Sequence, residues 1–129
     1  MMSCSSSATR TPRYDFVLNQ GADLTVPILL TDASSKAVDL SGYSVQMQLR
    51  TSVSAAQAVD TLTTQNGRIR LEATSGKLSL FFPNSITEKF PAQTLVYDIE
   101  ITSAGGQITR IVEGRIKVSA EVTRVTENS

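Results

Sequence analysis

Apolar and polar residues alternate along much of the chain, most regularly in residues 43–50 and 95–102. Successive side chains of a β-strand point to opposite faces, so a period of two predicts strands with one buried and one exposed face. The same alternation recurs in residues 77–82 and 115–120. The pattern predicts a mostly buried core made of Tyr43, Val45, Met47, Leu49, Leu78, Leu80, Tyr97, Ile99, Ile101, Ile116 and Val118.

Residues 95–124 are predicted to form a β-hairpin, around which the rest of the fold is organised. Gly105 and Gly106 separate its two strands, and glycine supplies the positive φ that a tight hairpin turn requires. Apolar residues of both parities precede Gly114. We therefore expect a β-bulge at Gly114 that restores the phase of the second strand.

Turn residues predict how the remaining strands are connected. Asn66-Gly67 stands between residues 59–64 and 68–74, and this dipeptide predicts a two-residue hairpin that pairs the two segments. Pro27 interrupts the alternation of residues 23–31. Because proline has no backbone N–H, this segment is expected to be an edge strand or to contain a bulge.

Helical signals are few. Ser85 and Glu88 have the spacing of a capping box, but Pro91 limits any helix there to about one turn.

About seven or eight short strands remain, at a spacing of roughly 8–12 residues. This count predicts an all-β protein, a single immunoglobulin-like antiparallel β-sandwich, with a small barrel as the alternative. We place the sandwich at residues 14–124 and a charged tail at 125–129.

Residues 1–13 are rich in serine and offer little to bury, so we interpret them as an extended N-terminal arm rather than a strand. Two interpretations stay open, a disordered tail or an arm that lies on a neighbouring subunit. In the second, Arg10 and Arg13 are the side chains best able to form charge-assisted hydrogen bonds.

Charge and composition exclude several classes of partner. Twelve basic residues balance twelve acidic ones among 129, so no field of one sign attracts nucleic acid or an anionic membrane. Cys4 is the single cysteine and has no partner for an internal disulfide. No stretch approaches the roughly 18 apolar residues of a membrane span, and residues 1–13 lack the core of a signal peptide. We expect a soluble protein made in a cytoplasm.

The chain contains no histidine, which removes the commonest general base, the histidine-containing catalytic triads and dyads, and the commonest zinc ligand. It also has no glycine-rich phosphate loop. Asp98 and Glu100 share one strand face, which indicates a solvated face rather than a glycosidase pair. Asp32 and Asp39 are too isolated for a dedicated calcium loop. We expect no catalytic residue, no cofactor, no metal and no small-molecule substrate.

Glycan-binding sandwiches usually present exposed aromatic rings, and this chain has no tryptophan. Phe81 is the one ring predicted to point away from the core. We expect it to be covered by the turn at residues 85–90 or by a partner.

Several short motifs occur in a regular order and spacing over about residues 14–124. They are Tyr14-Asp15-Phe16, Gln20-Gly21-Ala22-Asp23, Asp39-Leu40-Ser41-Gly42-Tyr43 with residues 46–50, residues 96–101, residues 109–114, and Glu121-Val122-Thr123-Arg124. Together they resemble a family of small virion structural proteins of tailed bacteriophages. They are also similar to the N-terminal β-sandwich of phage baseplate proteins.

The resemblance implies a non-enzymatic building block of the virion, in the tail or baseplate region or as a capsid accessory protein, made in the bacterial host cytoplasm. Its partners would be other virion proteins and copies of itself. The alternative is a binding module that attaches a fibre or recognises a host-surface glycan. The arginines expected to be exposed are solvated side chains or, in an assembly, pair with carboxylates of a neighbour. These candidate partner-binding residues are Arg10, Arg13, Arg50, Arg110 and Arg115.

Overall fold

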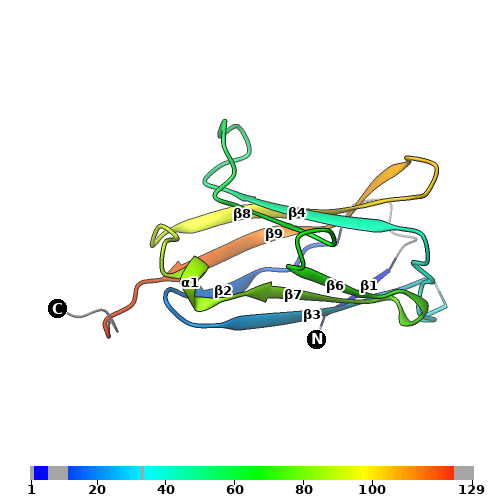
Figure 1. Ribbon diagram of the computed structural model, residues 1–129, viewed down its shortest axis with the longest axis horizontal. Helices are drawn as coiled ribbons and strands as arrows, with labels where there is room; N and C mark the ends of the chain where they lie inside the picture. Colours follow the sequence, from blue (N-terminus) through cyan, green and yellow to red (C-terminus); the bar gives the residue numbers. More distant parts are fainter. Residues whose placement is uncertain (1, 6–11, 33, 124–129) are drawn as a thin grey trace.

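The computed structural model describes residues 2–5, 12–32 and 34–123, and these form two β-sheets packed face to face (Figure 1). The predicted β-sandwich is confirmed, whereas its immunoglobulin-like character stays a prediction. One sheet has the order β1-β3-β7-β6, and the other has the order β2-β9-β8-β4-β5. The first contains β1 (Met2–Ser5), β3 (Leu24–Thr31), β7 (Lys77–Phe82) and β6 (Ile69–Glu72). The second contains β2 (Phe16–Asn19), β9 (Ile108–Ser119), β8 (Thr94–Thr102), β4 (Ser44–Arg50) and β5 (Asp60–Thr63).

The core lies between the two sheets, on the faces that the alternation predicts. Met47, Leu78 and Ile99 are fully buried and come from both sheets. Tyr43 is only partly buried, because it lies just before β4 begins. Every other residue of the predicted core is buried: Val45, Met47, Leu49, Leu78, Leu80, Tyr97, Ile99, Ile101, Ile116 and Val118.

Strands β8 and β9 form the predicted hairpin, with Gly106 at a φ of 89° in its turn. The expected bulge at Gly114 is wrong in position. The register shifts between Ile99 and Glu100, which oppose Val112 and Arg110, so Ile111 is the additional residue. A bulge three residues earlier restores the phase before Gly114 is reached, and Gly114 itself is regularly paired with Tyr97.

Gly114 is needed for a different reason, the close approach of the segment before β2. A Cβ atom at Gly114 would lie 2.9 Å from a carboxylate oxygen of Asp15 and closer still to the carbonyl of Tyr14. The Tyr14 carbonyl accepts a hydrogen bond from the hydroxyl of buried Tyr97, and the Tyr14 amide donates to the Glu113 carbonyl at 2.9 Å. Gly114 therefore lets an N-terminal segment close this edge of the five-stranded sheet.

Substituting Gly114 by alanine is expected to destabilise the protein by about 1–3 kcal/mol, because the new methyl group overpacks against the Tyr14 backbone. The substitution should also raise the hydrogen-exchange rate of the Tyr14 amide. Gly105→Ala is the matched control, since the nearest atom to its Cβ position lies 3.9 Å away. Equal melting curves for the two variants would contradict this role of Gly114.

The Asn66-Gly67 turn forms, with Gly67 at a φ of 79°, but the predicted hairpin is wrong. Strand β5 before the turn pairs with β4, and strand β6 after it pairs with β7, so the turn carries the chain from one sheet to the other. A turn signal indicates a reversal of the chain and does not specify the sheet that the next strand joins.

Residues 2–5 correct the interpretation of the N-terminus as an arm without a strand. They form β1, which pairs in parallel with residues 28–31 of β3. Strand pairing uses backbone groups, so a serine-rich segment can form a strand without a regular alternation of apolar residues. Pro27 lies beside the end of β1, where β3 pairs only with β7 among the described residues. The expectation of an edge at Pro27 is confirmed for this half of β3.

The short helix α1 (Asn84–Thr87) is a single turn, as Pro91 predicts, but the capping box does not form. The helix begins one residue before Ser85, and its Asn84 amide donates to Asp23 at 2.7 Å. Thr87 is fully buried and accepts a hydrogen bond from the Gly21 amide at 3.1 Å. The motif of residues 20–23 thus anchors α1 to the turn between β2 and β3.

Candidate functional site

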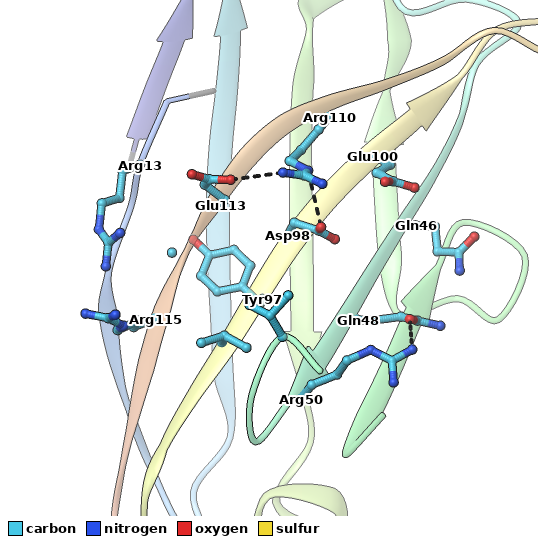
Figure 2. Close-up of a pocket in the computed structure, with 13 residues that line it drawn as sticks. Arg13, Gln46, Gln48, Arg50, Tyr97, Asp98, Glu100, Arg110, Glu113 and Arg115 are labelled. Carbon is cyan, nitrogen blue, oxygen red and sulfur yellow. Dashed lines mark hydrogen bonds and ion pairs between the residues drawn. The ribbon is translucent and has the colours of Figure 1, made fainter. Parts of the chain in front are cut away.

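An open groove of about 380 Å³ lies on the outer face, by which we mean the solvent side of the five-stranded sheet. Figure 2 shows its polar side chains, which come from β4, β8, β9 and the segment before β2. The loop of residues 51–58 rises above this face at the end of β4 (Figure 1). The groove is lined by Arg13, Gln46, Gln48, Arg50, Val53, Val96, Tyr97, Asp98, Glu100, Arg110, Glu113, Gly114 and Arg115.

The structure brings together four of the five arginines that the sequence singles out. Arg13, Arg50, Arg110 and Arg115 all line this groove, although about a hundred residues separate the first from the last. Arg10 lies outside the described residues. The strand pairing of β4, β8 and β9 creates this cluster, because it sets their outward positions side by side.

Register arranges the outward side chains into rows that run across the strands. Consecutive rows are two residues apart along each strand, or roughly 7 Å. From the β8–β9 turn towards the 51–58 loop, the first row is Gln46, Glu100 and Arg110, the second Gln48, Asp98 and Glu113, and the third Arg50, Val96 and Arg115. At the next position beyond the third row, Lys117 on β9 lies opposite Thr94 on β8.

Arg110 is the one arginine of the groove that holds two carboxylates. Its guanidinium lies 3.3 Å from Asp98 and 3.3 Å from Glu113 (Figure 2). The Arg110 side chain is half exposed, and such surface pairs contribute no more than about 1 kcal/mol each. Glu100 forms no ion pair with any described residue, so carboxylates outnumber cations in the first two rows.

Arg50 is held in place by uncharged groups. It donates to the Ala55 carbonyl of the overhanging loop at 2.9 Å and to the Gln48 side chain at 2.8 Å. A guanidinium has five N–H donors, so Arg50 keeps donors for another partner. Its position is therefore fixed before any partner binds.

Arg115 is exposed and lies at the other end of the third row from Arg50. Its backbone amide donates to Asp15 at 2.8 Å, and Asp15 pairs with Arg13 at 3.3 Å. The Arg115 side chain forms no ion pair within the described part of the chain. The third row thus presents cations at both ends.

Sequence reasoning assigned Asp98 and Glu100 to a solvated strand face, and both are partly exposed on the outer face. It did not identify Gln46, Gln48 and Glu113 as parts of a common site. Parity alone places these side chains on outward faces. The pairing of Arg110 with Asp98 depends on the one-residue bulge at Ile111, for which the sequence carries no clear signal.

The two isolated aspartates of the polar turns accept hydrogen bonds from residues that lie two to four positions further along the chain. Asp32 accepts hydrogen bonds from the Ser34 and Lys36 amides at 2.8 and 3.0 Å. Asp39 accepts from the hydroxyl and the amide of Ser41 at 2.6 and 2.9 Å. No cluster of three potential metal ligands occurs among the described residues.

Two carboxyl groups have lowered pKa values. The Arg115 backbone amide lowers the pKa of Asp15 below its ordinary 3.8, with help from Arg13, and the Ser41 hydroxyl lowers the pKa of Asp39. Depressed pKa values contribute stability that is present above the ordinary value and is lost as pH falls through the folded-state value.

Unfolding free energy should therefore vary little between about pH 6 and 8, where histidine would titrate, and should decrease below pH 3.8. Chemical denaturation in both pH ranges measures this free energy. Asp15→Asn should make the decrease in unfolding free energy at acidic pH smaller. A change in unfolding free energy centred near pH 6.5 would contradict the expectation.

Phe81 is partly buried, and part of its cover comes from a neighbouring strand. The Arg70 guanidinium lies 5.4 Å from the centre of its ring, and Phe90, from the expected cover of residues 85–90, packs on Phe82. Arg70 and Phe81 project from neighbouring strands of the four-stranded sheet, so this sheet covers part of the ring. Cover by a partner stays a prediction.

Within the part of the chain that the structure describes, no helix has the length and apolar character needed to cross a membrane. The chemistry of the outer groove consists of charge-assisted and neutral hydrogen bonding. Tyr97 is its one aromatic side chain and is only 5% exposed, with its hydroxyl bonded to the Tyr14 carbonyl.

No family model and no curated protein sequence matches the chain. Among solved structures, it is similar to one described as the "N-terminal domain of phage TP901-1 ORF48". The TM-score is 0.56, and the similarity covers 92% of this chain and 99% of the other. The two sequences are 8% identical, so the similarity is one of fold.

Proposed function

We propose that this protein is a non-enzymatic structural component of a tailed-phage virion. It acts through protein–protein contacts, in the tail or baseplate region or as a capsid accessory protein. Support comes from the motif resemblance over residues 14–124 and from the fold similarity to a phage protein domain. The observation that carries the proposal is the outer groove, where three strands and the N-terminal segment gather four arginines.

A polar, partly neutralised sheet face suits protein–protein contact in an assembly. Arginine is enriched at interfaces because its planar guanidinium makes several hydrogen bonds at once. Arg50 and Arg115 lie at the two ends of the third row, with the apolar Val96 between them. Such a row offers two charged anchors and a small apolar contact to a neighbouring subunit.

Complementation of a phage that lacks this chain tests the proposal. The double variant Arg50→Gln and Arg115→Gln should enter purified particles at less than about a tenth of the wild-type level, as expected when two interface anchors are lost. Copy number per particle is measured by quantitative mass spectrometry.

The matched control is Arg70→Gln together with Lys77→Gln, which removes two positive charges from the four-stranded sheet. This control should be incorporated normally. Both double variants must retain the wild-type melting curve for the comparison to hold. Normal incorporation of the Arg50 and Arg115 variant would remove the groove from the proposal.

The alternative role as a glycan-binding module has less support from the groove. Carbohydrate sites on β-sandwiches use the exposed faces of aromatic rings. The aromatic ring in this groove belongs to Tyr97, which is buried against the core. The fibre-attachment role stays within the proposed class of protein–protein contacts.

A further inference from the structure

The outer face is divided into an acidic half and a basic half. Its first two rows contain the carboxylates of Glu100, Asp98 and Glu113 against Arg110, with Arg13 of the N-terminal segment beside Glu113. The third row and the position beyond it contain Arg50, Arg115 and Lys117, and the carboxylate beside Arg115 belongs to Asp15, which pairs with Arg13. The boundary runs across the strands, between the second and third rows.

Neither half is fully neutralised by contacts within the described residues. Arg110 pairs with both Asp98 and Glu113. One of these carboxylates can therefore bind another cation while Arg110 stays paired with the other carboxylate. Glu100 has no ion pair there, and neither do Arg50, Arg115 and Lys117. The face therefore presents unsatisfied charge of both signs, and the two signs occupy separate areas.

From this separation we infer that the outer face binds the same face of a second copy of this chain, around a two-fold axis that crosses the strands between the second and third rows. Rotation about this axis places the basic third row of each copy over the acidic second row of the other. Along β9, it sets Arg115 over Glu113 of the second copy. Two-fold interfaces are isologous, so a face with separated charges is complementary to itself.

Exposed apolar side chains lie at both ends of the same face. Val53, in the loop that rises beside the basic end, is 88% exposed. Ile108, at the start of β9 near the acidic end, is 62% exposed and shares the outward parity of Arg110. The two-fold rotation turns the end with Val53 towards the end with Ile108, so association covers apolar area at both ends.

A second copy of this chain would be one partner of the surface that the proposed function uses. The inferred dimer rests on that proposal only for its biological setting. Charge swapping in the full-length chain tests it. One variant, Arg115→Glu, sets a carboxylate over Glu113 of the other copy, and a second, Glu113→Lys, sets a cation over Arg115 of the other copy. Neither side chain is buried, so both variants are expected to fold.

In sedimentation equilibrium, the wild-type chain should form a dimer that weakens as salt is added. Each variant alone should dimerise at least about tenfold more weakly, because like charges then face each other. An equimolar mixture of the two variants should restore a heterodimer. Arg50 is left unchanged, since it also supports the 51–58 loop.

The two variants differ in net charge and attract each other non-specifically, so a charge-matched pair on the four-stranded sheet is the control. Arg70→Glu, mixed with Glu72→Lys, should form no additional heterodimer. A monomeric wild-type chain, or equal association of the test and control mixtures, would overturn the inference. If the wild-type chain is monomeric and the charge-swap variants nevertheless fail to enter particles, the inferred dimer is overturned and the proposed function stands.

Discussion

Replacing Ile99 by alanine is expected to lower the unfolding free energy by about 2–5 kcal/mol. Ile99 is fully buried, and its strand β8 lies between β4 and β9 in the centre of the five-stranded sheet. Truncation removes apolar contacts and leaves a cavity that paired strands on both sides prevent from collapsing. Leu49→Ala, on the neighbouring strand β4, should have an effect of similar size because Leu49 is also fully buried.

Ile108→Ala is the matched control for this prediction. It deletes the same atoms from a side chain that is 62% exposed on β9, so the expected change is below about 0.5 kcal/mol. Chemical denaturation of the three variants measures the difference. Stability unaffected by the Ile99 and Leu49 substitutions would show that the strands face the opposite way.

Arg68→Ala is expected to cost about 3–5 kcal/mol, the range for breaking a buried ion pair by removing one partner. Arg68 binds both carboxylate oxygens of Asp60, at 2.6 and 3.2 Å, and its Nε donates to the Phe81 carbonyl at 2.7 Å. The two side chains are only 13% and 12% exposed. Because Asp60 belongs to β5 and Phe81 to β7, this arginine joins the two sheets where the Asn66-Gly67 turn crosses between them.

The control for Arg68 is Arg70→Ala, two residues along the same edge. Arg70 contacts the ring of Phe81 from a solvent-exposed position, so its loss should cost less than about 1 kcal/mol. Arg68→Lys keeps the charge but lacks the two-pronged geometry, and should fall between the other two variants in thermal denaturation. Equal melting temperatures for Arg68→Ala and Arg70→Ala would contradict this assignment.

The faces of the strands could be predicted from the sequence because alternation is a local property. Met47, Leu78 and Ile99 are buried as their parity requires, and the turns at residues 66–67 and 105–106 form where glycine indicates them. Strand partners are decided by distant residues instead. The turn at 66–67 therefore gave the correct reversal and the wrong hairpin.

The other differences also come from contacts between distant segments. Gly114 appeared to mark a bulge, but it accommodates the backbone of Tyr14, which lies a hundred residues earlier in the chain. Residues 2–5 form a strand because the edge of β3 offers backbone partners, which the composition of the N-terminus cannot reveal. In both cases the deciding atoms belong to the main chain of another segment.

The candidate site was predictable in part. Sequence alone indicates exposed strand positions for Arg50, Arg110 and Arg115, and the structure brings them onto one face. Their grouping into rows depends on the register of β4 on β8 and on the bulge at Ile111. The division of the face into acidic and basic halves follows from that register and is not visible along the sequence.

Quantitative mass spectrometry of purified phage particles, separated into heads and tails, shows whether this chain is a structural part of the virion. We expect the chain to stay with one of the two fractions after washing, at a fixed ratio to the other structural proteins. The fraction that retains it would also decide between the tail or baseplate region and the capsid. Recovery of the chain only in the lysate, with none in either fraction, would contradict a structural role in the virion.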